Sequence, residues 1–294
     1  MRVTVSTTYQ NMLLNLNRKA EDGDRLATMI ASGKRISKPQ EDPLAWAQAM
    51  NLKQGLRELG TFQKNVDFAL EWSQTTVNAL NSFSDLLDQA IKVGTEAVND
   101  SDNRTPQIET MDLISQQAVA LANTKYMDLY VFSGSKVSTA PFDETTLDYN
   151  GDALDFEVRA GKNNTQAINI DGQSTFIQDA ADPDGSNILK RLANLKGALE
   201  LGNMTEVQTQ TDALKSAQEH IRAQNAVAAS HQSYFNNQAS SLKTLKLNNT
   251  NQLSGLEDAD TAEAIILMQQ NQTALQAALQ VTAMLSDLSL VDFL

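Results

Sequence analysis

Hydrophobic residues recur every three or four positions along most of this chain, a spacing that predicts α-helices with one apolar face. From the fifth residue the first such row comprises Val5, Tyr9, Met12, Leu16, Leu26 and Ile30. Lys19 and Gly23 interrupt the row where further apolar residues would be expected. The pattern predicts a helix over 5–32, which Ser32-Gly33 would end because glycine readily adopts the left-handed conformation of a helix C-cap.

A second and longer helix is predicted from residue 43 to about residue 98. Asp42 is a suitable N-cap, and Pro43 is favoured at the first helical position. The apolar row continues in strict three/four alternation through Leu52, Leu56, Leu59, Gln63, Val66, Leu70, Ser73, Val77, Leu80, Ser84, Leu87 and Ile91. So long a repeat predicts a rod that packs on partner helices. A turn over 99–105 and another helix over 106–132 should follow.

Residues 133–186 differ in character, because they are rich in Gly, Asp, Asn and Thr. Asn150-Gly151 is a hairpin signal, and apolar residues alternate at Leu154, Phe156 and Val158. We therefore predict a small β domain inserted between helices. Its ten acids and three bases indicate a solvated outer face.

Helical patterns resume over 187–203 and from 207 to a polar break at 248–254. The last predicted helix begins near 258–260, where acids suit a helix N-terminus, and runs to about residue 288. Its apolar row comprises Leu267, Met268, Ala274, Leu275, Ala278, Val281, Leu285 and Leu288. The predicted fold is mainly α with a small β insert, arranged as a long antiparallel helical rod with nested, discontinuous domains. These are 1–42 with 250–294, then 43–132 with 187–249, and the insert 133–186.

The two terminal helices should pair with each other and with neighbouring subunits. Residues 1–40 have a net charge of +4 and residues 253–294 a net charge of −6, so their charges are complementary. Each exposed ion pair contributes little, so charge would mainly guide alignment. Ordering two isolated helices costs more backbone entropy than their apolar rows regain alone. We therefore predict that both ends stay disordered until assembly and that the apolar rows listed for them form the assembly interface.

Composition excludes several classes of protein. The chain has 294 residues, a net charge of −13 and no cysteine. The negative charge disfavours nucleic acid as a partner, and the missing thiols exclude disulfides and thiolate metal sites. The apolar runs are too short to cross a membrane, so no membrane partner is expected. The N-terminus lacks a cleavable signal, so the protein stays in the cytoplasm or leaves by a route that cuts no signal.

Candidate chemistry is sparse. His220 and His231 would lie about 16 Å apart on one helix, too far to share a metal ion. Ser133-Gly134-Ser135 lacks the strand-to-helix context of a nucleophile elbow. The acids of the insert, such as Asp143 and Asp148, lack the ligand order of a calcium loop. We expect no enzyme, no catalytic residue, no cofactor and no metal site.

Both ends also carry a family resemblance. Residues 1–9, 32–36 and 41–45, together with 260–264, 269–278 and 288–294, resemble bacterial flagellins and the junction members of the flagellin superfamily. The Tyr149–Asp152 segment and the Asp171-Gly172 turn before Phe176 resemble the junction members as well.

The resemblance implies a secreted, extracellular structural protein of the bacterial flagellum, exported unfolded by the type III apparatus. It would be an adaptor that joins hook to filament and templates flagellin, with copies of itself in a ring or helical layer. The implied partners are hook-associated protein 1, flagellin, and an export chaperone that binds the C-terminal helix. The alternative is a short or minor flagellin that forms the filament itself.

Overall fold

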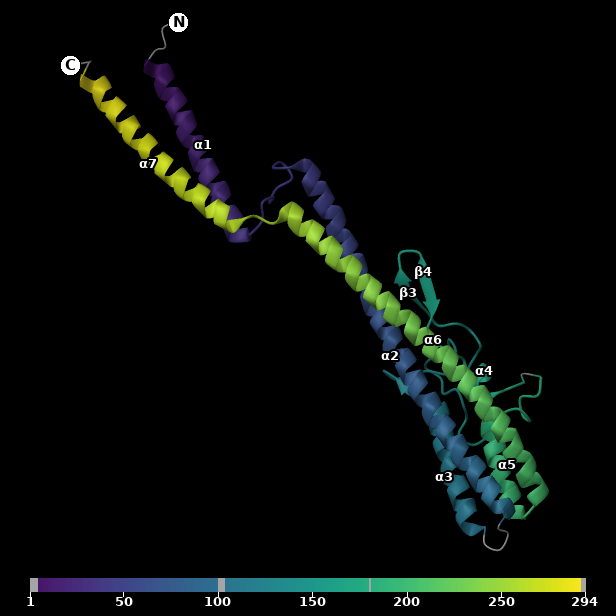
Figure 1. The fold of residues 1–294 in the computed structure, drawn as a ribbon. Helices are drawn as coiled ribbons and strands as arrows, with labels where there is room; N and C mark the ends of the chain where they lie inside the picture. The colour runs from purple at the N-terminus through teal and green to yellow at the C-terminus, as the bar shows by residue number, and fades with distance from the viewer. Residues whose placement is uncertain (1–4, 100–103, 180, 292–294) are drawn as a thin grey trace. The chain divides into compact units, whose positions relative to one another are not determined.

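The computed structural model describes residues 5–99, 104–179 and 181–291, most of which are helical (Figure 1). The helices are α1 Val5–Ser32, α2 Pro43–Asn99, α3 Thr105–Ala122, α4 Gly172–Phe176, α5 Ile188–Leu201, α6 Met204–Glu257 and α7 Thr261–Val291. The strands are β1 Lys125–Tyr126, β2 Leu129–Tyr130, β3 Glu157–Gly161 and β4 Asn164–Ala167. The predicted fold class, mainly α with a small β insert between long antiparallel helices, is confirmed.

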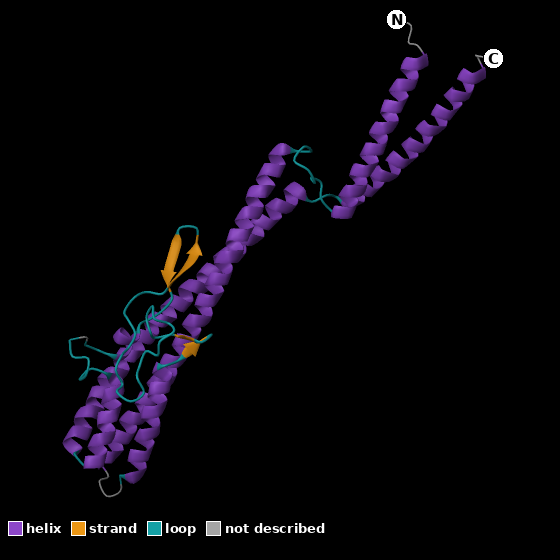
Figure 2. Cartoon of the chain, turned by 180° about the vertical axis from the view of Figure 1, so that it is seen from behind, coloured by secondary structure: helices purple, strands orange, loops and turns teal. Residues whose placement is uncertain are grey.

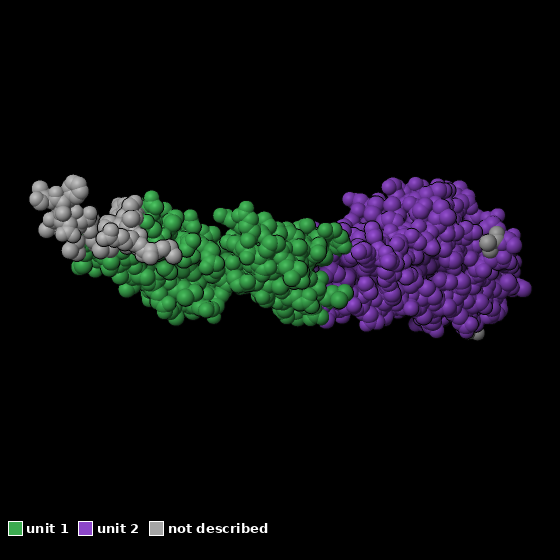
Figure 3. All heavy atoms as spheres, turned by 90° about the horizontal axis from the view of Figure 1, so that it is seen from above, with its two compact units in different colours: residues 1–58, 245–294 green, residues 59–244 purple. Residues whose placement is uncertain are grey.

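The chain divides into two compact units, each built from segments far apart in the sequence (Figure 3). One comprises residues 1–58 and 245–294, and the other comprises residues 59–244. Helices α2 and α6 contribute to both units.

In the first unit, α1 and α7 lie side by side and run in opposite directions (Figures 1 and 2). Gly33, with φ +66°, ends α1 at the residue the sequence predicted. The Asp42 carboxylate accepts a hydrogen bond from the Ala45 amide at 3.0 Å and so caps α2. Asp260 caps α7 in the same way, accepting from the Ala262 amide at 3.0 Å. These caps begin and end the helices where local sequence signals placed them.

In the second unit, α2 and α6 pack as an antiparallel pair, with α3 and α5 packed on each other beside them. Asn225 of α6 donates to Asn81 of α2 at 2.6 Å, and Gln232 donates to Gln74 two turns further on. The core between them contains large side chains from both helices, including Trp72, Leu80, Phe83, Leu87, Leu214, Ile221, Phe235 and Leu242. The apolar residues of the row predicted for α2, from Leu59 to Ile91, therefore pack in a core within this unit, whereas Leu52 and Leu56 belong to the first unit.

The insert is a loop-rich domain that contains the antiparallel hairpin β3–β4, and a second hairpin, β1–β2, comes just before it in the sequence (Figure 2). Phe176 of α4 attaches it to the helices, because its ring contacts that of Phe83 of α2 at a centroid distance of 4.9 Å. The same ring packs on Phe132 and Phe142 of the loops at 5.1 and 5.4 Å. Asp171 caps α4 by accepting from the Ser174 amide at 2.7 Å.

The helix predicted over 106–132 ends ten residues early, at Ala122. The Asn123 side chain explains the stop, since its amide donates to the Phe142 carbonyl at 2.9 Å and its oxygen accepts from the Phe142 amide at 3.0 Å. Met127 and Asp128 then adopt positive φ values of 47° and 65°, which form the tight turn between β1 and β2. The Asn123–Phe142 contact joins residues far apart in the sequence, so no local pattern predicts where α3 ends.

Two further predictions are wrong. The polar break at 248–254 lies inside α6, which continues to Glu257 because its polar side chains are mostly exposed on a regular helix. Asn150-Gly151 does not form a hairpin; the turn between β3 and β4 lies at residues 162–163. Gly151 instead lies in a loop where a Cβ atom would come within 2.4 Å of the Tyr149 ring. The predicted turn at 99–105 falls largely on residues 100–103, outside the described residues.

Replacing Phe176 by alanine should remove the attachment of the insert to the helices. We expect F176A to lower the free energy of unfolding by about 3–5 kcal/mol, because a fully buried ring leaves a cavity. Urea unfolding followed by circular dichroism measures this change. L154A, in an exposed residue of the same insert, should stay within about 0.5 kcal/mol of the parent. Equal effects of the two variants would contradict this role of Phe176.

Candidate functional site

The terminal helices α1 and α7 bury or half-bury seven of the fourteen residues expected to form the assembly interface. Leu26 is buried, and a larger group is half-buried, comprising Met12, Leu16, Ile30, Met268, Leu275 and Ala278. Leu267, Ala274 and Val281 are exposed. The side chains of Val5, Tyr9, Leu285 and Leu288 lie outside the described residues.

Helix α7 presents to α1 a face that the apolar pattern describes only in part. Ala264, Met268, Asn271, Leu275 and Ala278 recur at three/four spacing and are all buried or half-buried. The apolar pattern of the sequence does not identify Ala264 and Asn271 as contact residues, because one is small and the other polar. Extending the row one turn back from Met268 would have found Ala264.

Large apolar side chains remain exposed on the other faces of this helix pair. We call them the outer apolar set: Leu13, Leu14, Ile265, Ile266, Leu267, Leu279, Val281 and Met284. Each of these side chains is between 42% and 65% exposed. Several large exposed apolar side chains on one part of a protein can serve as a binding surface for another protein.

A buried carboxylate joins the segments where α1 ends and α7 begins. Glu257, whose side chain is 1% exposed, pairs with Lys53 of α2 at 2.5 Å and with Lys34 at 3.1 Å. Lys34 also pairs with Asp258 at 3.0 Å. We call these four residues the Glu257 clasp.

Backbone hydrogen bonds hold the same two segments together. The Arg35 amide donates to the Glu257 carbonyl at 2.6 Å, and the Ala259 amide donates to the Gly33 carbonyl at 2.9 Å. The Arg35 guanidinium adds a bond to the Leu256 carbonyl at 2.8 Å. The connection to α1 and the connection to α7 therefore form a short antiparallel ladder.

The clasp is held by opposite charges. Burial alone would raise the pKa of Glu257, but hydrogen bonds from Lys53 and Lys34 outweigh burial and leave that pKa below its usual value. Hydrogen bonds to Asp258 and Glu257 raise the pKa of Lys34. A hydrogen bond from Ser254, followed by one from Lys34, lowers the pKa of Asp258. All three groups are therefore held in their charged forms.

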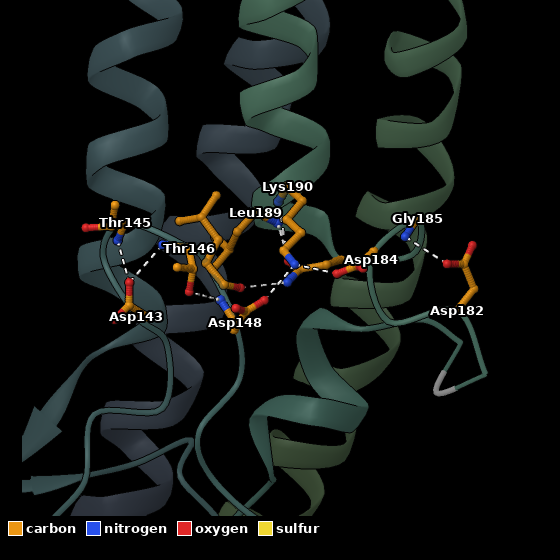
Figure 4. Close-up of polar contacts among 11 residues, drawn as sticks. Asp143, Thr145, Thr146, Asp148, Asp182, Asp184, Gly185, Leu189 and Lys190 are labelled. Carbon is orange, nitrogen blue, oxygen red and sulfur yellow. Dashed lines mark hydrogen bonds and ion pairs between the residues drawn. The ribbon is translucent and has the colours of Figure 1, made fainter.

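The acids of the insert shape its loops (Figure 4). Lys190, at the start of α5, pairs with Asp148 at 2.7 Å and with Asp184 at 2.5 Å, and so joins two loops. Asp143 accepts from the amides of Thr145 and Thr146, both at 2.8 Å. Within the described ranges, no group of three or more His, Asp or Glu side chains is arranged to hold a metal ion.

Both histidines lie on α6, as predicted. The His220 Nε2 atom lies 2.8 Å from the Ser174 carbonyl oxygen, so His220 joins α6 to α4. His231 is half-buried, and burial lowers its pKa while the Asp155 carboxylate opposes that effect. Neither contact is that of a reactive group.

Among the described residues, no helix combines the length and the apolar character needed to cross a membrane.

Comparison with known families matches both ends of the chain. The model of the bacterial flagellin N-terminal helical region matches residues 3–137, and that of the C-terminal helical region matches residues 211–294. The chain belongs to the flagellin family, a family of structural and non-enzymatic proteins of the extracellular bacterial flagellum. The expectation of a flagellar structural protein is confirmed.

Curated relatives align over nearly the whole chain. Flagellar hook-associated protein 3 of Salmonella typhimurium is 25% identical over 95% of both chains. The protein of the same name in Escherichia coli is 24% identical over 99% of this chain and 98% of its own. The flagellar filament 30.7 kDa core protein of Treponema maltophilum is 20% identical over 95% of this chain and 93% of its own.

Solved structures share the fold. A putative flagellar hook-associated protein from Vibrio parahaemolyticus superposes with a TM-score of 0.67 at 17% identity, covering 74% of this chain and all of that one. The flagellar junction protein FlgL from Legionella pneumophila superposes with a TM-score of 0.55 at 16% identity, covering 73% of this chain and all of that one.

Replacing Glu257 by alanine should open the clasp, because Lys34 and Lys53 lose their buried partner. We expect E257A to cost about 3 kcal/mol, the lower end for a buried ion pair, because both lysines reach solvent. Thermal or urea unfolding measures the loss. E96A, which removes the exposed Lys92–Glu96 pair, should cost less than about 1 kcal/mol. A loss from E257A no larger than that from E96A would contradict the role of the clasp.

The clasp should also weaken in acid. Because the folded pKa of Glu257 lies below its ordinary value of 4.5, its contribution is complete above pH 4.5 and is lost as the pH falls through the folded pKa. The amides of Arg35 and Ala259 should therefore keep their hydrogen-exchange protection above about pH 4.5 and lose it as the pH falls further, through the lowered pKa of Glu257. E257Q should show a flatter pH dependence of protection at these two amides. Identical profiles for E257Q and the parent would contradict the assignment.

Proposed function

We propose that this chain is a structural adaptor that joins the flagellar hook to the filament. The outer apolar set carries the proposal, because it leaves apolar side chains on both terminal helices free to bind other subunits. The names of the two curated relatives from Salmonella typhimurium and Escherichia coli, hook-associated protein 3, support the same assignment. In this role the chain acts by assembly and catalyses no reaction.

The proposed mechanism couples folding of the terminal region, 1–42 with 250–294, to docking. Helices α1 and α7 bury only one face against each other, so an isolated pair gains little to offset the entropy of ordering it. Neighbouring copies in a ring or helical layer would bury the outer apolar set and stabilise both helices. The layer would form on hook-associated protein 1 and offer its free edge to flagellin.

The same apolar residues need protection before assembly. Ile265, Ile266 and Leu279 would favour aggregation if α7 stayed uncovered. An export chaperone that binds α7 until secretion through the type III apparatus would prevent this. Folding after export also agrees with a chain that has no cysteine to oxidise on the way.

A short or minor flagellin is the second candidate. The similarity to the Treponema filament core protein, over 95% of this chain, favours it. Purified protein added to isolated hook ends separates the two functions. Continued fibre growth indicates a flagellin, whereas a layer that stops growing and then accepts flagellin indicates the adaptor.

The triple variant I265S/I266S/L279S should lose docking on hook ends while the rest of the chain stays folded. These side chains are exposed, so their replacement leaves the α1–α7 contact in place but removes apolar area from the docking surface. We expect at least about a tenfold loss of bound protein in cosedimentation with hook ends. Binding equal to that of the parent would contradict the proposed role of the outer apolar set.

A matched control replaces exposed apolar residues of the other unit. L113S/L201S removes side chains that are 58% and 86% exposed, and it should dock as well as the parent chain. An equal loss in this control would mean that reduced hydrophobicity, and not the terminal surface, weakens binding.

A further inference from the structure

The apolar pattern of α7 does not by itself fix how this helix aligns with α1. Ile265, Ile266, Leu267 and Met268 are consecutive and therefore point to all sides of the helix. Only Met268 of these four is turned toward α1 enough to be half-buried. A rotation or a one-turn slip of α7 would exchange one apolar contact for another, so burial gives weak preference for a single register.

A polar contact in the middle of the pair supplies that preference. Asn271, which is 8% exposed, donates from Nδ2 to the Lys19 backbone carbonyl of α1 at 2.8 Å. Glycine at residue 23 leaves room for this contact, since a Cβ atom there would lie 3.0 Å from Nδ2 and crowd it. Lys19 and Gly23, the two interruptions in the apolar row of α1, are therefore the residues that receive Asn271.

The Asn271 contact and the clasp belong to one antiparallel register. From the Gly33–Ala259 hydrogen bond, Lys19 lies fourteen residues back along α1 and Asn271 lies twelve residues forward along α7. At the rise of an α-helix, both displacements are about 20 Å. The pair is thus fixed at its clasp end and again about 20 Å away.

Asparagine at position 271 lowers the stability of the helix pair compared with an apolar residue. Its Oδ1 atom is buried without a hydrogen-bond partner among the described residues, so a leucine of similar shape would bury better. A buried asparagine in a helix pair characteristically fixes register at a cost in stability.

We infer that Asn271, seated over Gly23 against the Lys19 carbonyl, sets the register of the α1–α7 pair. The inference rests on the proposed function, because register matters when the pair must present one defined surface to neighbouring copies. With the register fixed, the outer apolar set lies in the same place on every subunit.

Spin-label distance measurements test the inference on the full chain. The chain has no cysteine, so N15C and Q276C, at exposed positions of α1 and α7, can be labelled specifically. Labelled protein is diluted with unlabelled protein and measured both free and docked on hook ends. We expect one narrow distance in the docked parent, and in N271L a second distance shifted by about 5 Å or more, one helical turn.

Two further variants complete the test. Q270L places a leucine at the neighbouring position and keeps the Asn271 contact. It should therefore retain the single distance between the spin labels. G23A strengthens the helix propensity of α1 but crowds Asn271, so it should give the second distance without unfolding α1. A single parental distance in both N271L and G23A would overturn the inference. A docked parent without any defined distance would instead overturn the proposed folding on docking, and the register with it.

Discussion

The structure depends on antiparallel pairing between segments at opposite ends of the sequence. α1 pairs with α7 and α2 pairs with α6, while the insert lies between the two inner helices in sequence. This nesting brings both termini into one unit and places the insert in the other. Each pair gains apolar burial only when its distant partner is present, so neither end of the chain can complete its unit alone.

Ion pairs contribute most to stability at the Glu257 clasp, where the carboxylate is buried. The ion pairs of the described residues that do not involve Glu257 have at least one exposed partner, as where Lys190 joins two acidic loops. Glu257 differs because it is buried at the C-terminal end of α6, where a negative charge is unfavourable to the helix dipole. Lys34 and Lys53 compensate for that cost, and they do so from two different segments. The ion pairs of Glu257 therefore hold α6 to α2 and to the segment that follows α1.

Local signals predicted most helix ends, and contacts between distant residues account for the errors. Ser32-Gly33 and Asp42-Pro43 act through their own backbone and caps, so sequence alone located them. The end of α3 depends on Asn123 binding Phe142, and the continuity of α6 through residue 257 depends on the clasp and on solvent-exposed polar side chains. For the site, the apolar rows located the helix pair. The apolar rows do not include Asn271, because they are defined by apolar residues and Asn271 is polar.

The ladder formed by Arg35, Glu257, Gly33 and Ala259 has a mechanical consequence. A single extended linker can rotate about its backbone bonds. Two segments that are joined by hydrogen bonds and a buried ion pair resist such rotation. Tension applied to the terminal helices is shared by both strands in shear, so several bonds must break together. Rotation of the terminal helices about this connection is therefore opposed by both segments of the chain at once.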